Sequence, residues 1–148
     1  MRQRGIIGIG VDICKVARIQ SLLERGPYYH ERFLTGTFHP SEVEEFRAKE
    51  VDHVRVQYLA SRWALKEALV KASGRTDLDY RGIYLLKDAQ NKRKKPLLAV
   101  SGDKNQAIFY DELDVCAMHA SISHEEDYAV AFVTLEGLLE VEESVPKD

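Results

Sequence analysis

Two ionisable side chains on one predicted helix are the first candidates for chemistry. Residues 58–73 read YLASRWALKEALVKAS, and Glu67 and Lys71 stand four positions apart. A helix therefore places both on one stripe, among mostly apolar neighbours that predict burial on most sides. A carboxylate and an ammonium in such surroundings are costly unless they pair or bind something. An ordinary structural Glu–Lys pair is the alternative interpretation.

A third candidate is Asp12, which stands near the end of the apolar stretch 5–13, GIIGIGVDI. The strict alternation predicts a strand with Gly8, Gly10 and Asp12 on one face. Two glycines on one face indicate that another backbone or a ligand comes close there. Asp12 either presents its carboxylate to a ligand or caps the helix that follows.

Asp12 and Glu67 together are the donors that Mg²⁺ prefers, which are one or two carboxylates completed by water and phosphate oxygens. Lys71 could neutralise a phosphate held by such a metal or protonate a leaving oxygen. Each residue alone has an ordinary structural explanation, but the three together outline a metal–phosphate site.

Four further polar residues could contribute to such a site. Arg62 and Lys66 lie on the same helix as Glu67, and Ser123 and His124 close a predicted strand. The strand pair could add a phosphate contact or a proton donor. As sequence neighbours they point to opposite strand faces, which argues against a serine hydrolase triad. The chain has neither a GxxxxGK loop nor a GxGxxG motif.

The bulk properties limit the possible functions. The chain has 148 residues, which suits one domain, and a net charge of −3, which argues against nucleic-acid and anionic-membrane partners. Cys14 and Cys116 are far apart and fit neither a disulfide framework nor a zinc site. No apolar run is long enough to span a bilayer. We expect a cytoplasmic protein, or a mitochondrial one if a transit peptide has been removed.

The order of the predicted elements is mixed, which favours an α+β fold over a doubly wound parallel sheet. Besides the central helix and the strand 5–13, we expect a turn-rich connection at 31–38, a basic hairpin turn at 88–96, and a solvated link at 47–55. Ser41 and Glu44 have capping-box spacing, so a helix should begin near Ser41. The remaining expected elements are helices at 15–25, 41–46 and 102–113 and strands at 83–86, 97–101, 118–124 and 128–135.

Three motifs in this order resemble one enzyme family. They are GIGVDI at residues 8–13, RWALKEA at 62–68 followed by Lys71 and Ala72, and SISH at 121–124 followed by YAVA at 128–131. The chain resembles the short, holo-[acyl-carrier-protein]-synthase type of 4′-phosphopantetheinyl transferase over about residues 5–136. The resemblance implies a single-unit α+β fold with an antiparallel sheet packed on a long central helix. It predicts a domain at 1–137 followed by an acidic, poorly ordered tail at 138–148.

The resemblance also implies an activity. Such an enzyme moves 4′-phosphopantetheine from coenzyme A to a serine of an apo acyl carrier protein and releases adenosine 3′,5′-bisphosphate. Asp12 and Glu67 match the Mg²⁺ ligands of the family, and Lys71 matches a lysine that contacts the pyrophosphate. A general base must take the serine proton, and a carboxylate or a water held by Asp12 or Glu67 could do so.

Further roles follow from the same resemblance. Ser123 and His124 match positions near the coenzyme A phosphates, and Arg62 and Lys66 are candidates for nucleotide contacts. Arg18 matches a basic residue of the first helix, which docks the acidic carrier protein. The family forms homotrimers with sites at subunit interfaces, and a chain of this length fits that arrangement.

This chain departs from the family pattern in three places. Ser61 stands where glycine is common, the basic turn at 92–95 replaces a shorter Gly-Lys-Pro turn, and the chain continues past Gly137. A non-catalytic module that binds coenzyme A or a carrier protein would keep the same motifs. An unrelated Mg²⁺-dependent phosphoryl-transfer enzyme would explain the residues but not their order.

Overall fold

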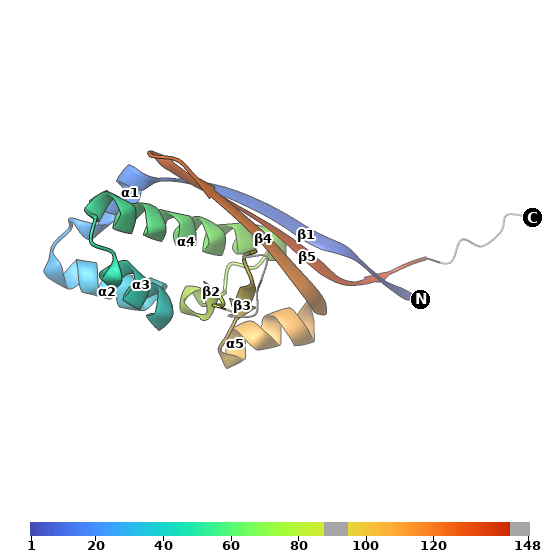
Figure 1. The fold of residues 1–148 in the computed structure, drawn as a ribbon. Helices are drawn as coiled ribbons and strands as arrows, with labels where there is room; N and C mark the ends of the chain where they lie inside the picture. Colours follow the sequence, from blue (N-terminus) through green and yellow to red (C-terminus); the bar gives the residue numbers. More distant parts are fainter. Residues whose placement is uncertain (88–94, 143–148) are drawn as a thin grey trace, which may run out of the picture.

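The computed structural model describes residues 1–87 and 95–142 and has an α+β architecture (Figure 1). The elements are, in chain order, β1 (Arg2–Lys15), α1 (Val16–Leu23), α2 (Pro27–Thr37), α3 (Pro40–Ala48), α4 (Asp52–Ser73), the 3₁₀ turn η1 (Tyr80–Gly82), β2 (Ile83–Leu85), β3 (Leu98–Val100), α5 (Asp103–Gln106), the π-helical turn η2 (Ala107–Glu112), β4 (Val115–His124) and β5 (Tyr128–Glu140).

Helix α4 is the centre of the molecule. A three-stranded antiparallel sheet of order β1–β5–β4 lies along one side of it, and α2, α3 and the β2–β3 hairpin lie on the other (Figure 1). Burial from both sides explains why the sequence of this helix is apolar nearly all round. Gly74 ends the helix in the left-handed conformation, with φ of 68°, as its position in the sequence predicts.

The glycines of β1 allow α4 to approach the sheet closely. A Cβ atom added to Gly8 would lie 1.8 Å from the carbonyl oxygen of Ala72, and one added to Gly10 would lie 2.0 Å from that of Ala68. Neither distance is possible between real atoms. The prediction that another backbone comes close to these glycines is therefore confirmed, and that backbone is α4.

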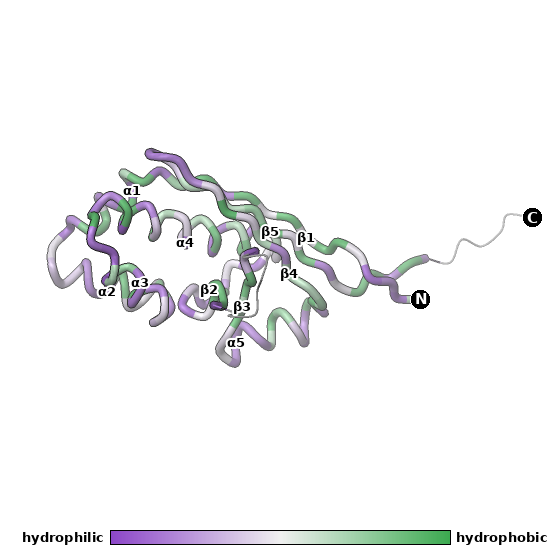
Figure 2. Tube along the Cα trace, viewed as in Figure 1, coloured by the Kyte–Doolittle hydropathy of each residue, from purple (hydrophilic) through white to green (hydrophobic). Residues whose placement is uncertain are grey.

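The other face of the sheet is apolar and open to solvent. Ile9, Val11 and Ile13 of β1 are 61%, 51% and 64% exposed, and Phe132 of β5, which pairs with Val11, is 42% exposed. Hydrophobic stretches run along β1 and β5 (Figure 2). A contiguous exposed patch of this kind marks an interaction surface rather than an ordinary solvated face. We call these four side chains the aliphatic face.

The structure confirms the α+β class, the first strand, the central helix and the late hairpin, but residues 31–38 are not a turn-rich connection. Residues 31–37 belong to α2, which begins at Pro27, and Phe38 caps its end. Proline is favoured at a first helical position, so Gly26 and Pro27 start this helix rather than merely ending α1. Phe33 and Leu34 are buried, and their packing outweighs the poor helix propensity of the segment.

The start of α3 was predicted correctly but its capping residues were not. The cap is His39, whose ring accepts from the Ser41 N–H while Glu42 accepts from the His39 N–H. The predicted partner Glu44 is exposed. Helix α4 begins at Asp52, so the second half of the predicted link 47–55 is helical.

The end of the chain continues the sheet. Strand β5 runs to Glu140 and pairs Leu138 and Leu139 with Arg4 and Gln3, so the first residues of the predicted tail are strand. Residues 143–148, and 88–94 of the predicted basic turn, lie outside the described residues. The predicted helix 102–113 is α5 followed by η2. Among the described residues, no helix combines the length and hydropathy needed to cross a bilayer.

The close approach at Gly10 can be tested by adding one methyl group. Gly10→Ala should lower the free energy of unfolding by about 3 kcal/mol, because the new Cβ meets backbone that cannot move aside. Gly36→Ala is the matched control: it adds the same methyl in α2, where nothing lies within 4 Å, and should raise stability by about 0.5–1 kcal/mol. Urea denaturation of both variants measures the difference, and equal stabilities would contradict the packing argument.

Candidate active site

Asp12, Glu67 and Lys71 come together where β1 crosses α4. Asp12 lies on the same strand face as Gly8 and Gly10, so the close helix approach carries α4 past its carboxylate. The Lys71 ammonium donates to Asp12 Oδ1 at 3.0 Å and to the Val11 carbonyl at 3.1 Å. The Asp12 side chain is 16% exposed and that of Lys71 is 54% exposed. Asp12 and Lys71 are therefore in direct contact, and Glu67 lies one helical turn before Lys71 on α4.

Tyr80 belongs to this group although the sequence did not indicate it. Burial raises the pKa of Tyr80 to about 12, and the negative charge of Glu67, a hydrogen bond to the same carboxylate and the charge of Asp12 act in the same direction. The Tyr80 ring meets the Trp63 ring edge-on at 5.8 Å between centroids. Tyr80 lies in η1, seven residues beyond the end of α4, so no periodic pattern could have linked it to Glu67.

Arg18 stands at the edge of the same group. Its guanidinium lies over the Trp63 ring, 5.8 Å from the centroid, and its side chain is exposed. Burial raises the pKa of the neighbouring Cys14 thiol to about 11; Arg18 acts against this shift, while Asp12 and Glu67 add to it. The charges of Arg18, Asp12 and Glu67 therefore all act on the Cys14 thiol.

The residues around Asp12 fit a Mg²⁺ ion better than a transition metal. Asp12 and Glu67 offer hard oxygen donors, and Mg²⁺ is commonly bound by two carboxylates together with waters and substrate phosphates. Within residues 1–87 and 95–142, no cluster of three or more histidine, cysteine or acidic side chains could form an all-protein metal cage. Any ion held here must take its other ligands from water and substrate.

A separate cavity of about 900 Å³ opens between α3, α4, β2, the residues 95–96 that precede β3, and the end of β4. Arg62 lines it, stacks on Tyr58 at 4.5 Å and donates to the Ser61 hydroxyl at 3.0 Å. His124 lines the same cavity. The other cationic residues of its wall are Lys49, Lys87 and Lys95. A basic cavity with aromatic walls suits a phosphorylated aromatic ligand.

The group around Asp12 and the cavity lie on different sides of α4. Arg62 and Glu67 are five positions apart, which is about 140° around a helix. In the sheet, β5 separates Asp12 on β1 from His124 on β4. One protomer therefore holds two separate half-sites, which we name by their residues: the acidic half-site of Asp12, Glu67, Lys71 and Tyr80, and the basic half-site of Arg62, His124 and the cavity.

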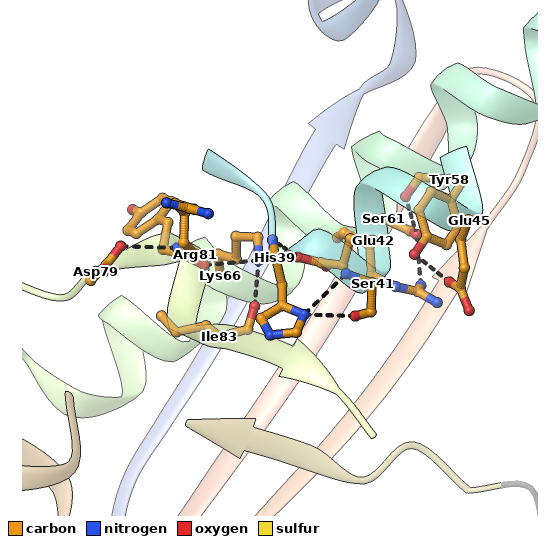
Figure 3. A network of polar contacts seen from close by, with 12 residues as sticks. His39, Ser41, Glu42, Glu45, Tyr58, Ser61, Lys66, Asp79, Arg81 and Ile83 are labelled. Carbon is orange, nitrogen blue, oxygen red and sulfur yellow. Dashed lines mark hydrogen bonds and ion pairs between the residues drawn. The ribbon is translucent and has the colours of Figure 1, made fainter. Parts of the chain in front are cut away.

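Lys66 belongs to neither half-site. Its side chain is completely buried, and its ammonium donates to Glu42 Oε1 at 2.6 Å, to the Tyr80 carbonyl at 2.9 Å and to the Ile83 carbonyl (Figure 3). Burial lowers the pKa of Lys66, and the Glu42 charge acts against that shift. All three donors are used inside the protein, so the geometry gives Lys66 no free donor for a coenzyme.

Ser123 also points away from both half-sites. It is exposed and pairs across the sheet with Val130, one position out of step with His124, which pairs with Ala129. Successive strand residues face opposite sides. Ser123 therefore lies on the open side of the sheet, as the argument against a hydrolase triad predicts, and His124 lies on the α4 side.

Comparison with known proteins identifies the family of the chain. A sequence model of the 4′-phosphopantetheinyl transferase superfamily matches residues 8–133. A holo-[acyl-carrier-protein] synthase of Halalkalibacterium halodurans is 38% identical over 133 residues, covering 90% of this chain and 98% of the relative.

Solved structures of holo-ACP synthases superpose on this chain. The holo-ACP synthase of Plasmodium yoelii superposes with a TM-score of 0.73 at 28% identity, covering 91% of this chain and 98% of that one. The Bacillus anthracis enzyme, solved in complex with CoA (3′,5′-ADP), superposes with a TM-score of 0.67 at 28% identity, covering 89% and 97%. Because the family model spans most of the sequence and the relatives align along nearly their whole length, the chain belongs to the 4′-phosphopantetheinyl transferase superfamily.

Proposed function

We propose that the protein is a holo-[acyl-carrier-protein] synthase that transfers 4′-phosphopantetheine from coenzyme A to a serine of an apo acyl carrier protein. The products are the holo carrier and adenosine 3′,5′-bisphosphate. The observation that carries the proposal is the acidic half-site, where the Lys71 ammonium and the Asp12 carboxylate meet at 3.0 Å beside Glu67. Relatives that are named for this activity align with 88–90% of the chain and with 98% of their own length.

The chemistry needs charge neutralisation and alignment more than a protein nucleophile. The serine oxygen bonds to the β-phosphorus of coenzyme A, and the bond from that phosphorus to the bridging oxygen breaks. Lys71 stabilises the charge that develops on the leaving oxygen, and the carboxylate of Asp12 or Glu67 accepts the serine proton, directly or through water. Held by Asp12 and Glu67, Mg²⁺ would supply further positive charge to the pyrophosphate.

The nucleotide end of coenzyme A belongs in the basic half-site. Arg62 and His124 line the cavity with further cationic side chains, and two phosphorylated groups of adenosine bisphosphate need such partners. Because Lys66 is fully engaged in the interior, our proposal for the coenzyme contacts does not include it. Ser123 can contact a coenzyme only from the open side of the sheet.

A homotrimer would join the two half-sites. The reactive pyrophosphate needs Asp12 and Glu67, the nucleotide needs Arg62 and His124, and one protomer holds these sets on different sides of α4. The aliphatic face supplies the surface on which neighbouring protomers can pack. We therefore propose that each complete site takes its acidic half from one protomer and its basic half from the next.

The carrier protein would dock beside the acidic half-site. Arg18 is exposed there, over Trp63, where it can meet the acidic surface of a carrier. Charge reversal in Arg18→Glu should raise KM for the carrier and leave KM for coenzyme A unchanged.

Cys14 and Cys116 are both free thiols, which suits the reducing cytoplasm that we propose as the compartment.

The activity itself can be tested by mass spectrometry. An apo acyl carrier protein incubated with this protein, coenzyme A and Mg²⁺ should gain the mass of one phosphopantetheine, and a matched sample with chelator should gain none. Loss of the product with chelator is expected because Asp12 and Glu67 form no all-protein metal cage with other residues of the described ranges 1–87 and 95–142, so they would hold the ion weakly. Coenzyme A binding without any mass gain, on several carriers, would instead support a non-catalytic binding module.

The assignment of Glu67 as a ligand of Mg²⁺ predicts that replacing one of its carboxylate oxygens by an amide nitrogen strongly lowers kcat. Glu67→Gln keeps the shape of the side chain but removes the charge, and it should lower kcat at least about 100-fold while thermal unfolding stays close to the wild type. Glu140→Gln is the control, because that carboxylate is 78% exposed at the far end of β5. Full activity in Glu67→Gln would remove this residue from the proposed machinery.

The assembly predicts a second pair of variants. Ile9→Asp places a charge on the aliphatic face and should convert a trimer into protomers of 16.9 kDa that no longer transfer phosphopantetheine. Val51→Asp, at a position that is 59% exposed and caps α4, should leave both size and activity unchanged. Sedimentation velocity measures the size. A wild-type monomer that is active would contradict the shared site.

A further inference from the structure

The buried pair Lys66–Glu42 occupies the middle of the polar network shown in Figure 3. The two side chains are 0% and 3% exposed and their charged atoms are 2.6 Å apart. Lys66 comes from α4 and Glu42 from α3, so the pair joins the central helix to the second layer. Such pairs are weak sources of stability, because the desolvation of both charges offsets their attraction. Stability therefore does not explain why this buried pair is present, and a different role is needed.

One end of the network reaches the acidic half-site. The Lys66 ammonium donates to the carbonyl oxygens of Tyr80 and Ile83, which bracket η1. These bonds fix the short turn that carries the Tyr80 side chain. The Tyr80 ring packs on Trp63 and its hydroxyl interacts with the Glu67 carboxylate. Lys66 thus acts on Glu67, its own neighbour in sequence, through a loop from elsewhere in the chain.

The other end of the network reaches the basic half-site. Glu42 Oε1 accepts from the His39 N–H at 2.9 Å as well as from Lys66. The His39 ring accepts from the Ser41 N–H and stacks on Tyr84, with 3.7 Å between centroids and 13° between planes. His39, Ser41, Glu42 and Tyr84 all line the cavity. One carboxylate oxygen therefore holds both the lysine and a wall of the cavity.

We infer that Lys66 and Glu42 are a positioning pair that sets the geometry of both half-sites at once. The inference rests on the proposed function. Lys66 fixes Tyr80 and, through it, Glu67, while Glu42 fixes His39 and the stacked wall of the cavity. Lys66 has no donor left for the coenzyme, and only 3% of the Glu42 side chain is exposed in the cavity wall. In the described residues the second oxygen of Glu42 is buried without a hydrogen-bond partner, a cost that a purely structural residue would not need to carry.

A double variant separates positioning from stability. Lys66→Met and Glu42→Met, each alone, leave one buried charge without its partner and should lower the melting temperature strongly. Combined, they replace the pair by two apolar side chains of similar size and should restore most of that loss. The bonds to Tyr80, Ile83 and His39 do not return. If the pair positions the half-sites, the stable double variant still shows about a tenfold lower kcat/KM for coenzyme A.

Two readouts show where the defect lies. Trp63 is the single tryptophan of the chain and packs on Tyr80, so its emission should shift in the double variant. Calorimetric titration of Mg²⁺ into the complex with coenzyme A should show a weaker affinity. Leu135→Ala is the matched control: it removes a buried side chain of β5, a strand that carries none of the network residues, and should lower the melting temperature without changing either readout.

The outcomes are distinct. Wild-type kinetics and emission in the stable double variant would overturn the positioning role and leave the proposed function intact. The same kinetic defect in Leu135→Ala would also overturn it, since lost stability alone would then explain the effect. If the double variant does not fold, Glu42→Gln decides. Its amide oxygen can still accept from Lys66 and His39, so below its lowered melting temperature it should keep near wild-type kcat/KM, and a tenfold loss there would contradict the inference. A wild-type protein without transferase activity would overturn the proposed function, and this inference with it.

Discussion

The contact between β1 and α4 is the constraint on which the rest of the structure depends. Gly8 and Gly10 have no side chain, so the carbonyl oxygens of Ala68 and Ala72 lie where a Cβ would be. Only at this separation can Lys71, one residue before Ala72, reach the carboxylate of Asp12. The same contact turns the opposite face of β1 outward, because the strand alternates. The contact between β1 and α4 therefore both forms the acidic half-site and exposes the aliphatic face.

Helix α4 shows why spacing alone cannot assign roles to charged residues. Lys66 and Lys71 are both lysines on one helix, yet the first is completely buried and the second is 54% exposed. Their positions differ by five residues, or about 140° around the axis. Lys66 therefore faces α3 and meets Glu42, and Lys71 faces β1 and meets Asp12. A sequence shows that both are cations but not which neighbouring layer each will meet.

The parts of the fold that the sequence predicted are those with strong local signals. Strict alternation indicated β1, and Gly74 marked the end of α4. Helix α2 was missed because its stability comes from burying Phe33 and Leu34 rather than from local propensity. At the site, the sequence motifs pointed to Asp12 and Lys71, which the structure brings into contact, and to Glu67, one helical turn before Lys71. No sequence pattern indicated Tyr80, because its approach to Glu67 depends on a turn that is fixed by contacts with α4.

The division of charge between the two half-sites also bears on how the chemistry can be fast. In one protomer Lys71 is half exposed, and water weakens its attraction for a phosphate to about a kilocalorie per mole at contact distance. Covering the site with a second protomer would lower the local dielectric constant and strengthen every charge interaction within it. The burial of the aliphatic face would provide the free energy to exclude that water. Assembly would then contribute to catalysis itself, because the same contact that completes the set of residues also removes the solvent that weakens them.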